Sequence, residues 1–145
     1  MKRILAAALA ALAVAGSAQA QEAPSNLVTV LTAPEPQTQL MAMVLTMQAA
    51  EQGATPHILL CGPAGDLALA DAPESATAGQ PPRDMSPQGL MQAIMQQEGA
   101  RVEVCAIYLP GRGEGPEVLL EGVGVAEPGA MAAAIMAPDT RVTGY

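Results

Sequence analysis

The two cysteines of this chain are the residues best suited to chemistry, and each follows an apolar run of strand length. Cys61 comes directly after Ile58-Leu59-Leu60, and Cys105 sits near the end of a run that begins at Arg101. In an open α/β sheet, reacting groups gather at the carboxyl ends of the strands. A thiol placed there becomes nucleophilic when a helix N-terminus or a nearby cation lowers its pKa. The sequence therefore predicts a thiol site, with Cys105 as its first candidate and Cys61 as its second.

The segment after Cys105 carries groups that suit such a site. Residues 108–115 are rich in glycine and proline and are predicted to form a loop. The Arg112 side chain and backbone amides such as that of Gly111 can steady a thiolate, a persulfide or a small anion. We expect Tyr108 and Arg112 to shape the pocket. The alternative is that Cys105 is simply buried and behaves as a small apolar residue, and the residues alone do not separate these readings.

The relation between the two thiols is also left open by the sequence. If their strands are neighbours, the thiols lie close together, and a disulfide needs Cα atoms within roughly 7 Å. A bond closing a loop of more than forty residues contributes about 4 kcal/mol in the chain-entropy model. A structural disulfide, two independent thiols and a reducible redox pair all remain compatible with the sequence.

Histidine and acidic residues give no second catalytic site. His57 is the only histidine and lies at the start of its predicted strand, at the opposite end from Cys61. We expect it to be solvated, which argues against a Cys/His catalytic pair. The acidic residues Asp66, Asp71, Glu74 and Asp84 are too widely spread for a calcium loop and are expected on the solvated surface.

The methionines raise a metal alternative, because thioether and thiolate ligands suit Cu(I). They cluster along two predicted helices, at Met41, Met43 and Met47 and at Met85, Met91 and Met95. Met91 and Met95 recur at helical core spacing, and a chain with no Phe or Trp needs methionine to fill its core. We therefore expect these residues in the core, with no metal site and no cofactor.

The first twenty residues resemble a secretory signal. Lys2 and Arg3 precede an apolar run from Ile4 to Ala15, and Ala18-Gln19-Ala20 offers the small residues that signal peptidase accepts. The run is shorter than the roughly 20 residues of a spanning helix, so no stable membrane anchor is expected. Cleavage after Ala20 leaves one domain, residues 21–145, in the periplasm, where disulfides form.

The charge balance excludes whole classes of partner. Lys and Arg total 6 and Asp and Glu total 14. Loss of Lys2 and Arg3 with the signal leaves 4 − 14 = −10. A chain this acidic is a poor ligand for nucleic acid.

Strand-like and helix-like segments alternate along the chain. Strands are predicted over residues 27–32, 56–61, 101–106, 122–125 and 140–143, and helices over 37–52, 86–97 and 130–136. Such alternation favours a parallel sheet with helices on both faces. The predicted fold class is α/β, a three-layer α/β/α sandwich on a mostly parallel five-stranded sheet.

Two stretches resemble the DsrE/DsrF-like family of small α/β proteins. One is Val102-Glu103-Val104-Cys105 after a helix ending in Glu98-Gly99, and the other is Gln52-Gly53 leading into His57-Ile58-Leu59-Leu60. The resemblance extends roughly over residues 27–142. It implies a DsrE-like fold, assembly into oligomers and, as in several family members, relay of sulfur as a cysteine persulfide.

By position, Cys105 matches the family's cysteine at the end of the third strand. Tyr108 stands where many relatives carry a second cysteine. The predicted export argues against the cytoplasmic transfer-RNA thiolation that some relatives serve.

The first functional hypothesis is a periplasmic carrier of sulfur or thiols rather than an enzyme with turnover of its own. Cys105 would carry the cargo, Cys61 would be its partner, and a sulfur or thiol donor protein would load a homo-oligomer. One alternative is a non-catalytic oligomeric binding module with structural cysteines. A weaker one is a Cu(I)-binding protein that uses Cys and Met.

Overall fold

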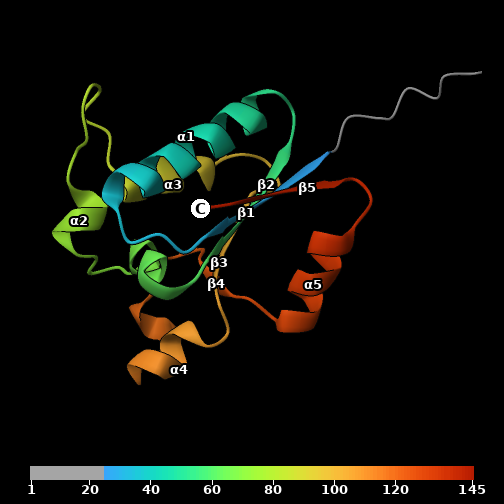
Figure 1. Ribbon diagram of the computed structural model, residues 1–145. Helices are drawn as coiled ribbons and strands as arrows, with labels where there is room; N and C mark the ends of the chain where they lie inside the picture. Colours follow the sequence, from blue (N-terminus) through green and yellow to red (C-terminus); the bar gives the residue numbers. More distant parts are fainter. Residues whose placement is uncertain (1–24) are drawn as a thin grey trace, which may run out of the picture.

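The computed structural model describes residues 25–145, so the predicted signal and its cleavage site lie outside the described residues. The described chain forms one sheet of five strands in the order β4-β3-β2-β1-β5, with every neighbouring pair parallel (Figure 1). The strands are β1 (Asn26–Leu31), β2 (Thr55–Leu60), β3 (Arg101–Val104), β4 (Gly124–Val125) and β5 (Thr140–Gly144). The predicted α/β class and parallel sheet are confirmed.

The helices fall on both sides of this sheet. The α-helices are α1 (Pro36–Glu51), α2 (Glu74–Thr77), α3 (Pro87–Ile94), α4 (Tyr108–Arg112) and α5 (Pro128–Met136), and the 3-10 helices are η1 (Gly62–Ala68) and η2 (Pro116–Val118). Figure 1 shows α1 and α3 together over one face and α5 alone on the other side. No helix within residues 25–145 is long and apolar enough to cross a membrane.

The face under α1 and α3 is densely packed. Alternate residues of the central strands, including Ile58 and Leu60, point into it and are fully buried. Met43 from α1 and Met91 from α3 meet them and are also fully buried. Burial of apolar surface at this density supplies most of the stability of a domain of this size. The predicted role of methionine as core filler holds at both positions. The prediction is wrong for Met41, which is 52% exposed on the outer side of α1.

The other face is covered by the nine residues of α5. Met131 is the buried residue of this helix, whereas Met136 at its end is 80% exposed. The Glu127 carboxylate caps the helix by accepting a hydrogen bond from the Ala130 N–H at 2.8 Å. That bond, and a second from Gly129, hold the pKa of Glu127 below its ordinary value. One short helix thus spans an area that two helices cover on the opposite side.

Local sequence signals account for most of the element boundaries. Helix α1 starts at Pro36 and gives way to Gly53, which has a positive φ of 95°. The Ser86 hydroxyl caps α3 by accepting from the Gly89 N–H at 3.1 Å, as a Ser-Pro start predicts. Predicted and observed boundaries of the strands agree within two residues.

The prediction of a plain loop over residues 108–115 is wrong. Residues 108–112 form helix α4, which ends at Gly113 in the left-handed conformation with φ of 70°. Tyr108 and Leu109 are buried. Burial of these two side chains against the core offsets the poor helix propensity of a five-residue segment that includes Pro110 and Gly111. Within the segment 71–84, also predicted to be irregular, the short helix α2 forms.

Candidate functional site

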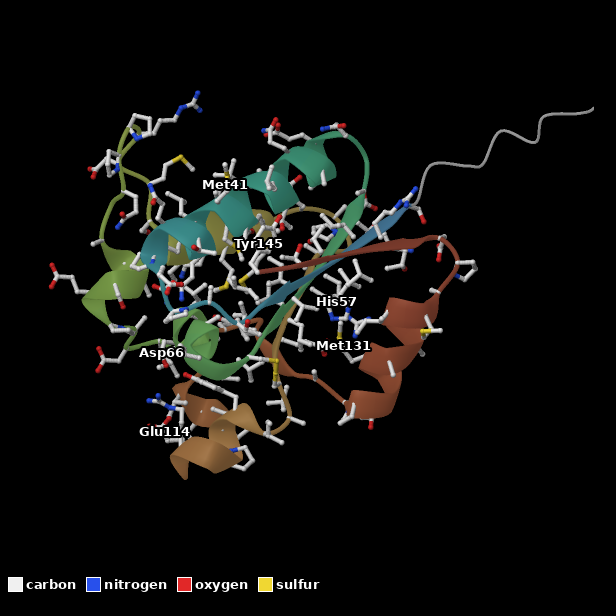
Figure 2. All side chains as sticks on the ribbon, in the orientation of Figure 1. Met41, His57, Asp66, Glu114, Met131 and Tyr145 are labelled. Carbon is white, nitrogen blue, oxygen red and sulfur yellow. A yellow bond between two sulfur atoms is a disulfide. The ribbon has the colours of Figure 1, made fainter. Side chains whose placement is uncertain are left out.

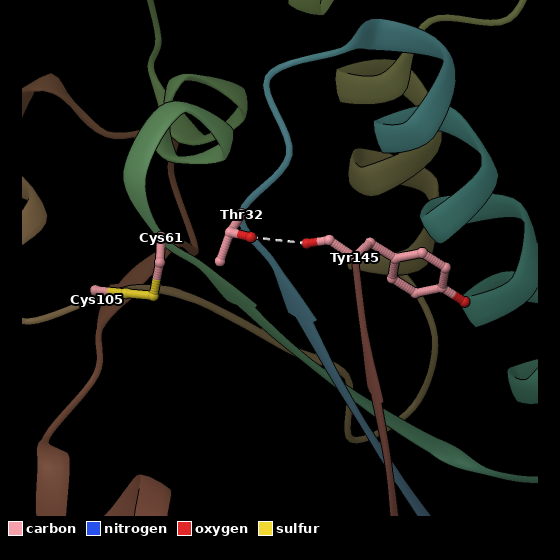
Figure 3. The surroundings of a disulfide bond; sticks show 4 residues. All are labelled: Thr32, Cys61, Cys105 and Tyr145. Carbon is pink, nitrogen blue, oxygen red and sulfur yellow. Dashed lines mark hydrogen bonds between the residues drawn. A yellow bond between two sulfur atoms is a disulfide. The ribbon is translucent and has the colours of Figure 1, made fainter.

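The two cysteines form a disulfide at the carboxyl edge of the sheet (Figure 3). Strands β2 and β3 are parallel neighbours in which Leu60 is paired with Val104, so the next residue of each strand is a cysteine. The Cys105 N–H donates to the Leu60 carbonyl at 2.9 Å, which extends the ladder to this point. The two Cα atoms are 5.2 Å apart, a distance typical of disulfides. The sequence left open a structural disulfide, two independent thiols and a reducible redox pair. The structure contains a disulfide, so independent thiols are ruled out in this state.

The disulfide lies on the same side of the sheet as α5. Ile58 and Leu60 point toward α1 and α3, so alternation directs Leu59 and Cys61 to the opposite face. Both cysteines are half-buried rather than fully enclosed. The sulfur pair is therefore near the surface, at the edge where the chain leaves the sheet.

A hollow of about 320 Å³ lies next to Cys105, between the sheet and α5. Its nine lining residues are all alanine, leucine, isoleucine, methionine, proline or cysteine. They include Leu59, Cys105, Ile107, Met131, Ala132 and Ile135. Ile107, at its rim, is 80% exposed. Cys105 lines this hollow and Cys61 does not, so the two sulfurs of the bond have different surroundings.

A group of polar side chains ties together the two segments that follow the cysteines. Asp66, in η1, accepts a hydrogen bond from the Tyr108 hydroxyl at 2.7 Å and another from Arg112 Nη1 at 3.2 Å. Arg112 Nε also donates to the Glu114 carboxylate at 2.6 Å, and its guanidinium carbon lies 5.5 Å from the centre of the Tyr108 ring. We call Asp66, Tyr108, Arg112 and Glu114 the clasp; Figure 2 labels Asp66 and Glu114.

The clasp accounts for the positions of the residues predicted to shape the site. The Arg112 guanidinium is held against two carboxylates and an aromatic ring, so its visible role is to fasten α4 onto η1. Gly111 is exposed. Burial of the ring, followed by the hydrogen bond to Asp66, raises the pKa of Tyr108 well above its ordinary value. Tyr108 is therefore a neutral hydrogen-bond donor throughout the physiological pH range.

Asp66 and Glu114 are the clasp residues that sequence reasoning missed, and Asp66 was expected on the solvated surface. It is half-buried, and its partner Tyr108 lies 42 positions along the chain. The neighbouring Gly65 is a partial sequence signal that another side chain packs closely against this segment. A Cβ at this position would lie 2.6 Å from Cζ of the Tyr108 ring, so a glycine is needed for the ring to dock.

His57 is buried, and the expectation that it is solvated is wrong. Only 8% of it is exposed, and its Nε2 lies 2.6 Å from the Glu103 carboxylate. The register explains the pair, since His57 is paired with Arg101 and Glu103 follows on the same face of β3. Figure 2 shows His57 on the side of the sheet that α5 covers. It lies four residues before Cys61, or roughly 13 Å along the strand, so it does not serve the sulfur pair.

The disulfide bears directly on the Cu(I) alternative, which used cysteine and methionine as ligands. Both thiols are consumed in the disulfide, so neither is a free thiolate ligand in this state. Among residues 25–145, no group of three or more His, Cys, Asp or Glu side chains converges.

Comparison with solved structures identifies the fold. The chain is similar to the protein of unknown function MTH1491 from Methanobacterium thermoautotrophicum, with 16% identity and a TM-score of 0.59. It is also similar to the ychN protein from E. coli, with 16% identity and a TM-score of 0.63. Each match covers 83% of this chain and 98% of the other. The chain has a DsrE-like fold.

The sequence comparisons add no family to this result. No family model matches the chain, and no curated protein matches it. At 16% identity the structural likeness establishes the fold alone.

Proposed function

We propose that this protein is an exported carrier of sulfur or thiols whose resting form is the Cys61–Cys105 disulfide. The observation that carries the proposal is the position of Cys105. It is half-buried, bonded to Cys61 and on the wall of a hollow that opens to solvent. A disulfide that served stability alone would gain most from full enclosure, which slows exchange with external thiols.

A resting disulfide is a sulfur acceptor that needs no further oxidant. Hydrosulfide attacks Sγ of Cys105, a new S–S bond forms, and the Cys61–Cys105 bond breaks. Cys61 leaves as the thiolate with the electron pair of the broken bond, and Cys105 carries a persulfide. Attack of the Cys61 thiolate on Sγ of Cys105 reverses the step and expels the sulfur as hydrosulfide. Loading and release thus use the same two residues.

The clasp keeps the two sulfurs close when their bond is open. Asp66 follows Cys61 by five positions, and Tyr108 follows Cys105 by three. The bonds from Tyr108 and Arg112 to Asp66 therefore join the same two segments without involving sulfur. A thiolate at Cys61 held near Cys105 closes the disulfide again as an intramolecular reaction.

The site of action and the partners belong to the same proposal. The predicted signal directs the chain to the periplasm, where disulfides persist. There a donor protein or a small thiol would load Cys105 on a homo-oligomer.

The test is intact-mass measurement of folded protein exposed to excess hydrosulfide and then to a thiol-alkylating reagent. We expect the mass of one H₂S to be added, with one alkylated thiol on Cys61 and one alkylated persulfide on Cys105. Cys105→Ser is the matched control and takes up no sulfur at residue 105. A disulfide that opens only after denaturation would reject the carrier function.

The second candidate is a binding module in which the disulfide is purely structural. It is favoured by the exposed apolar residues Met136 on α5 and Val142 on β5, which are 80% and 46% exposed. If the disulfide is purely structural, hydrosulfide leaves the folded protein unchanged. Reduction of the disulfide then only lowers the free energy of unfolding.

A further inference from the structure

We infer that the hollow beside Cys105 binds the apolar body of an uncharged, low-molecular-weight organic thiol, and that this class of thiol opens the disulfide. The inference rests on the proposed carrier function and specifies its cargo. It comes from the lining of the hollow, its size and its position next to one sulfur.

The lining selects against charge. All nine residues around the hollow are apolar or cysteine, so none offers a cation to a carboxylate. Transfer of an unpaired carboxylate to such surroundings is strongly unfavourable. The formal charge of the whole chain is −8, which adds a repulsion against anionic thiols as they approach. Uncharged thiols meet neither penalty.

The size selects a small molecule. About 320 Å³ lies at the lower end of the range for small-molecule sites. Ala132 and Ile135 of α5 form one wall and Leu59 of the sheet forms another, so an alkyl chain contacts apolar side chains on both sides. Each methylene buried there strengthens binding about fourfold.

The position joins binding to reaction. With its alkyl body in the hollow, the bound thiol loses its proton to solvent, and its sulfur attacks Sγ of Cys105. The bond to Cys61 breaks, Cys61 leaves as the thiolate, and Cys105 carries the cargo as a mixed disulfide. Return attack by Cys61 on Sγ of Cys105 releases the thiol, so the protein holds and delivers it without net oxidation.

The first experiment compares 1-butanethiol, 2-mercaptoethanol, 3-mercaptopropionate and hydrosulfide as reagents for opening the disulfide in folded protein. Rate constants are corrected for the thiolate fraction and intrinsic nucleophilicity of each reagent. We expect the corrected rate constant for butanethiol to exceed that for 2-mercaptoethanol by about tenfold or more, because butanethiol buries more methylenes in the hollow. The rate constant for mercaptopropionate should be the lowest. The rate should also saturate with butanethiol concentration and stay linear with 2-mercaptoethanol.

The second experiment uses two neighbouring alanines on α5. Ala132 and Ala133 are both exposed, but Ala132 lines the hollow and Ala133 does not. We expect Ala132→Glu to slow disulfide opening by butanethiol about tenfold and to leave opening by hydrosulfide nearly unchanged. Ala133→Glu should change neither rate. If Ala132→Glu fails to fold, Ile135→Ala replaces it, and its loss of apolar contact should reduce the preference for butanethiol.

The outcomes separate this inference from the carrier function on which it rests. Equal corrected rates for all four reagents, or equal effects of Ala132→Glu and Ala133→Glu, overturn the binding site but leave the carrier intact. Failure of every reagent, hydrosulfide included, to open the disulfide in folded protein overturns the carrier function itself.

Discussion

The two faces of the sheet are built by different means. Under α1 and α3, fully buried apolar side chains such as Leu60 and Met91 make up most of the packing. The few buried polar groups there are hydrogen-bonded, as in the Thr29–Thr46 hydroxyl pair and in Gln88, which donates to the Leu67 and Leu69 carbonyls. Under α5, the same strands present half-buried Leu59, the His57–Glu103 pair and the disulfide. The packed face derives its stability from apolar burial, whereas the open face depends on specific bonds and keeps space for a ligand.

Removal of the disulfide should have the largest effect of the substitutions considered. Cys61→Ser with Cys105→Ser releases a link across 44 positions, which corresponds to about 4 kcal/mol of unfolding free energy. Denaturant unfolding of the variant against the oxidised wild type measures this, with reduced wild type as the control. A loss below about 1 kcal/mol would show that the open face does not need its covalent link.

Two adjacent leucines of β2 test the comparison within one strand. Leu60→Ala on the packed face should cost about 3 kcal/mol, because a fully buried side chain leaves a cavity. Leu59→Ala on the open face should cost about 1 kcal/mol, because Leu59 is half-buried and already borders a hollow. Equal losses in chemical denaturation would contradict the distinction between the faces.

The His57–Glu103 pair tests whether the open face relies on polar pairing. His57→Leu leaves the Glu103 carboxylate, whose side chain is 18% exposed, without its partner and should cost about 2 kcal/mol. Adding Glu103→Gln should recover part of that loss. Arg101→Ala is the control, since the Arg101 side chain is 58% exposed and its 3.7 Å contact to Glu103 should contribute less than about 0.5 kcal/mol.

The last predicted effect concerns the clasp. Tyr108→Phe removes the hydroxyl that donates to Asp66 and should cost about 1 kcal/mol at neutral pH. Folding raises the pKa of Tyr108, so the neutral phenol is the form that the folded state favours. The contribution of the Tyr108–Asp66 hydrogen bond to the free energy of unfolding is therefore complete below about pH 10, the ordinary tyrosine pKa. It declines as the pH rises toward the pKa of Tyr108 in the folded state. Melting curves of both proteins from neutral to alkaline pH should therefore converge.

Local patterns in the sequence were enough to predict the sheet, its parallel sense and the three long helices. Apolar runs such as Ile58-Leu59-Leu60 and helix-ending residues such as Gly53 act over a few neighbouring residues, so they can be recognised in the sequence alone. The position of both cysteines at strand ends was predicted in the same way, and their proximity followed once β2 and β3 were neighbours.

What the sequence did not predict depends on contacts between distant segments. The partner of His57 is 46 positions away and that of Asp66 is 42 positions away, and both pairings require the register and the docking of α4. Helix α4 itself forms because Tyr108 and Leu109 find buried sites, not because its residues favour a helix. The hollow next to Cys105 likewise exists because one short helix covers a wide face.

The bond between Cys61 and Cys105 also turns the intervening chain into a covalent ring. The ring contains α2, α3 and β3, together with the exposed Arg83. A protease that cuts once after Arg83 adds one water but releases no fragment, because the nicked pieces remain joined through sulfur. The same cut in the reduced protein leaves two polypeptides with no covalent bond between them. The oxidation state of the cysteine pair therefore decides whether the nicked chain stays covalently connected.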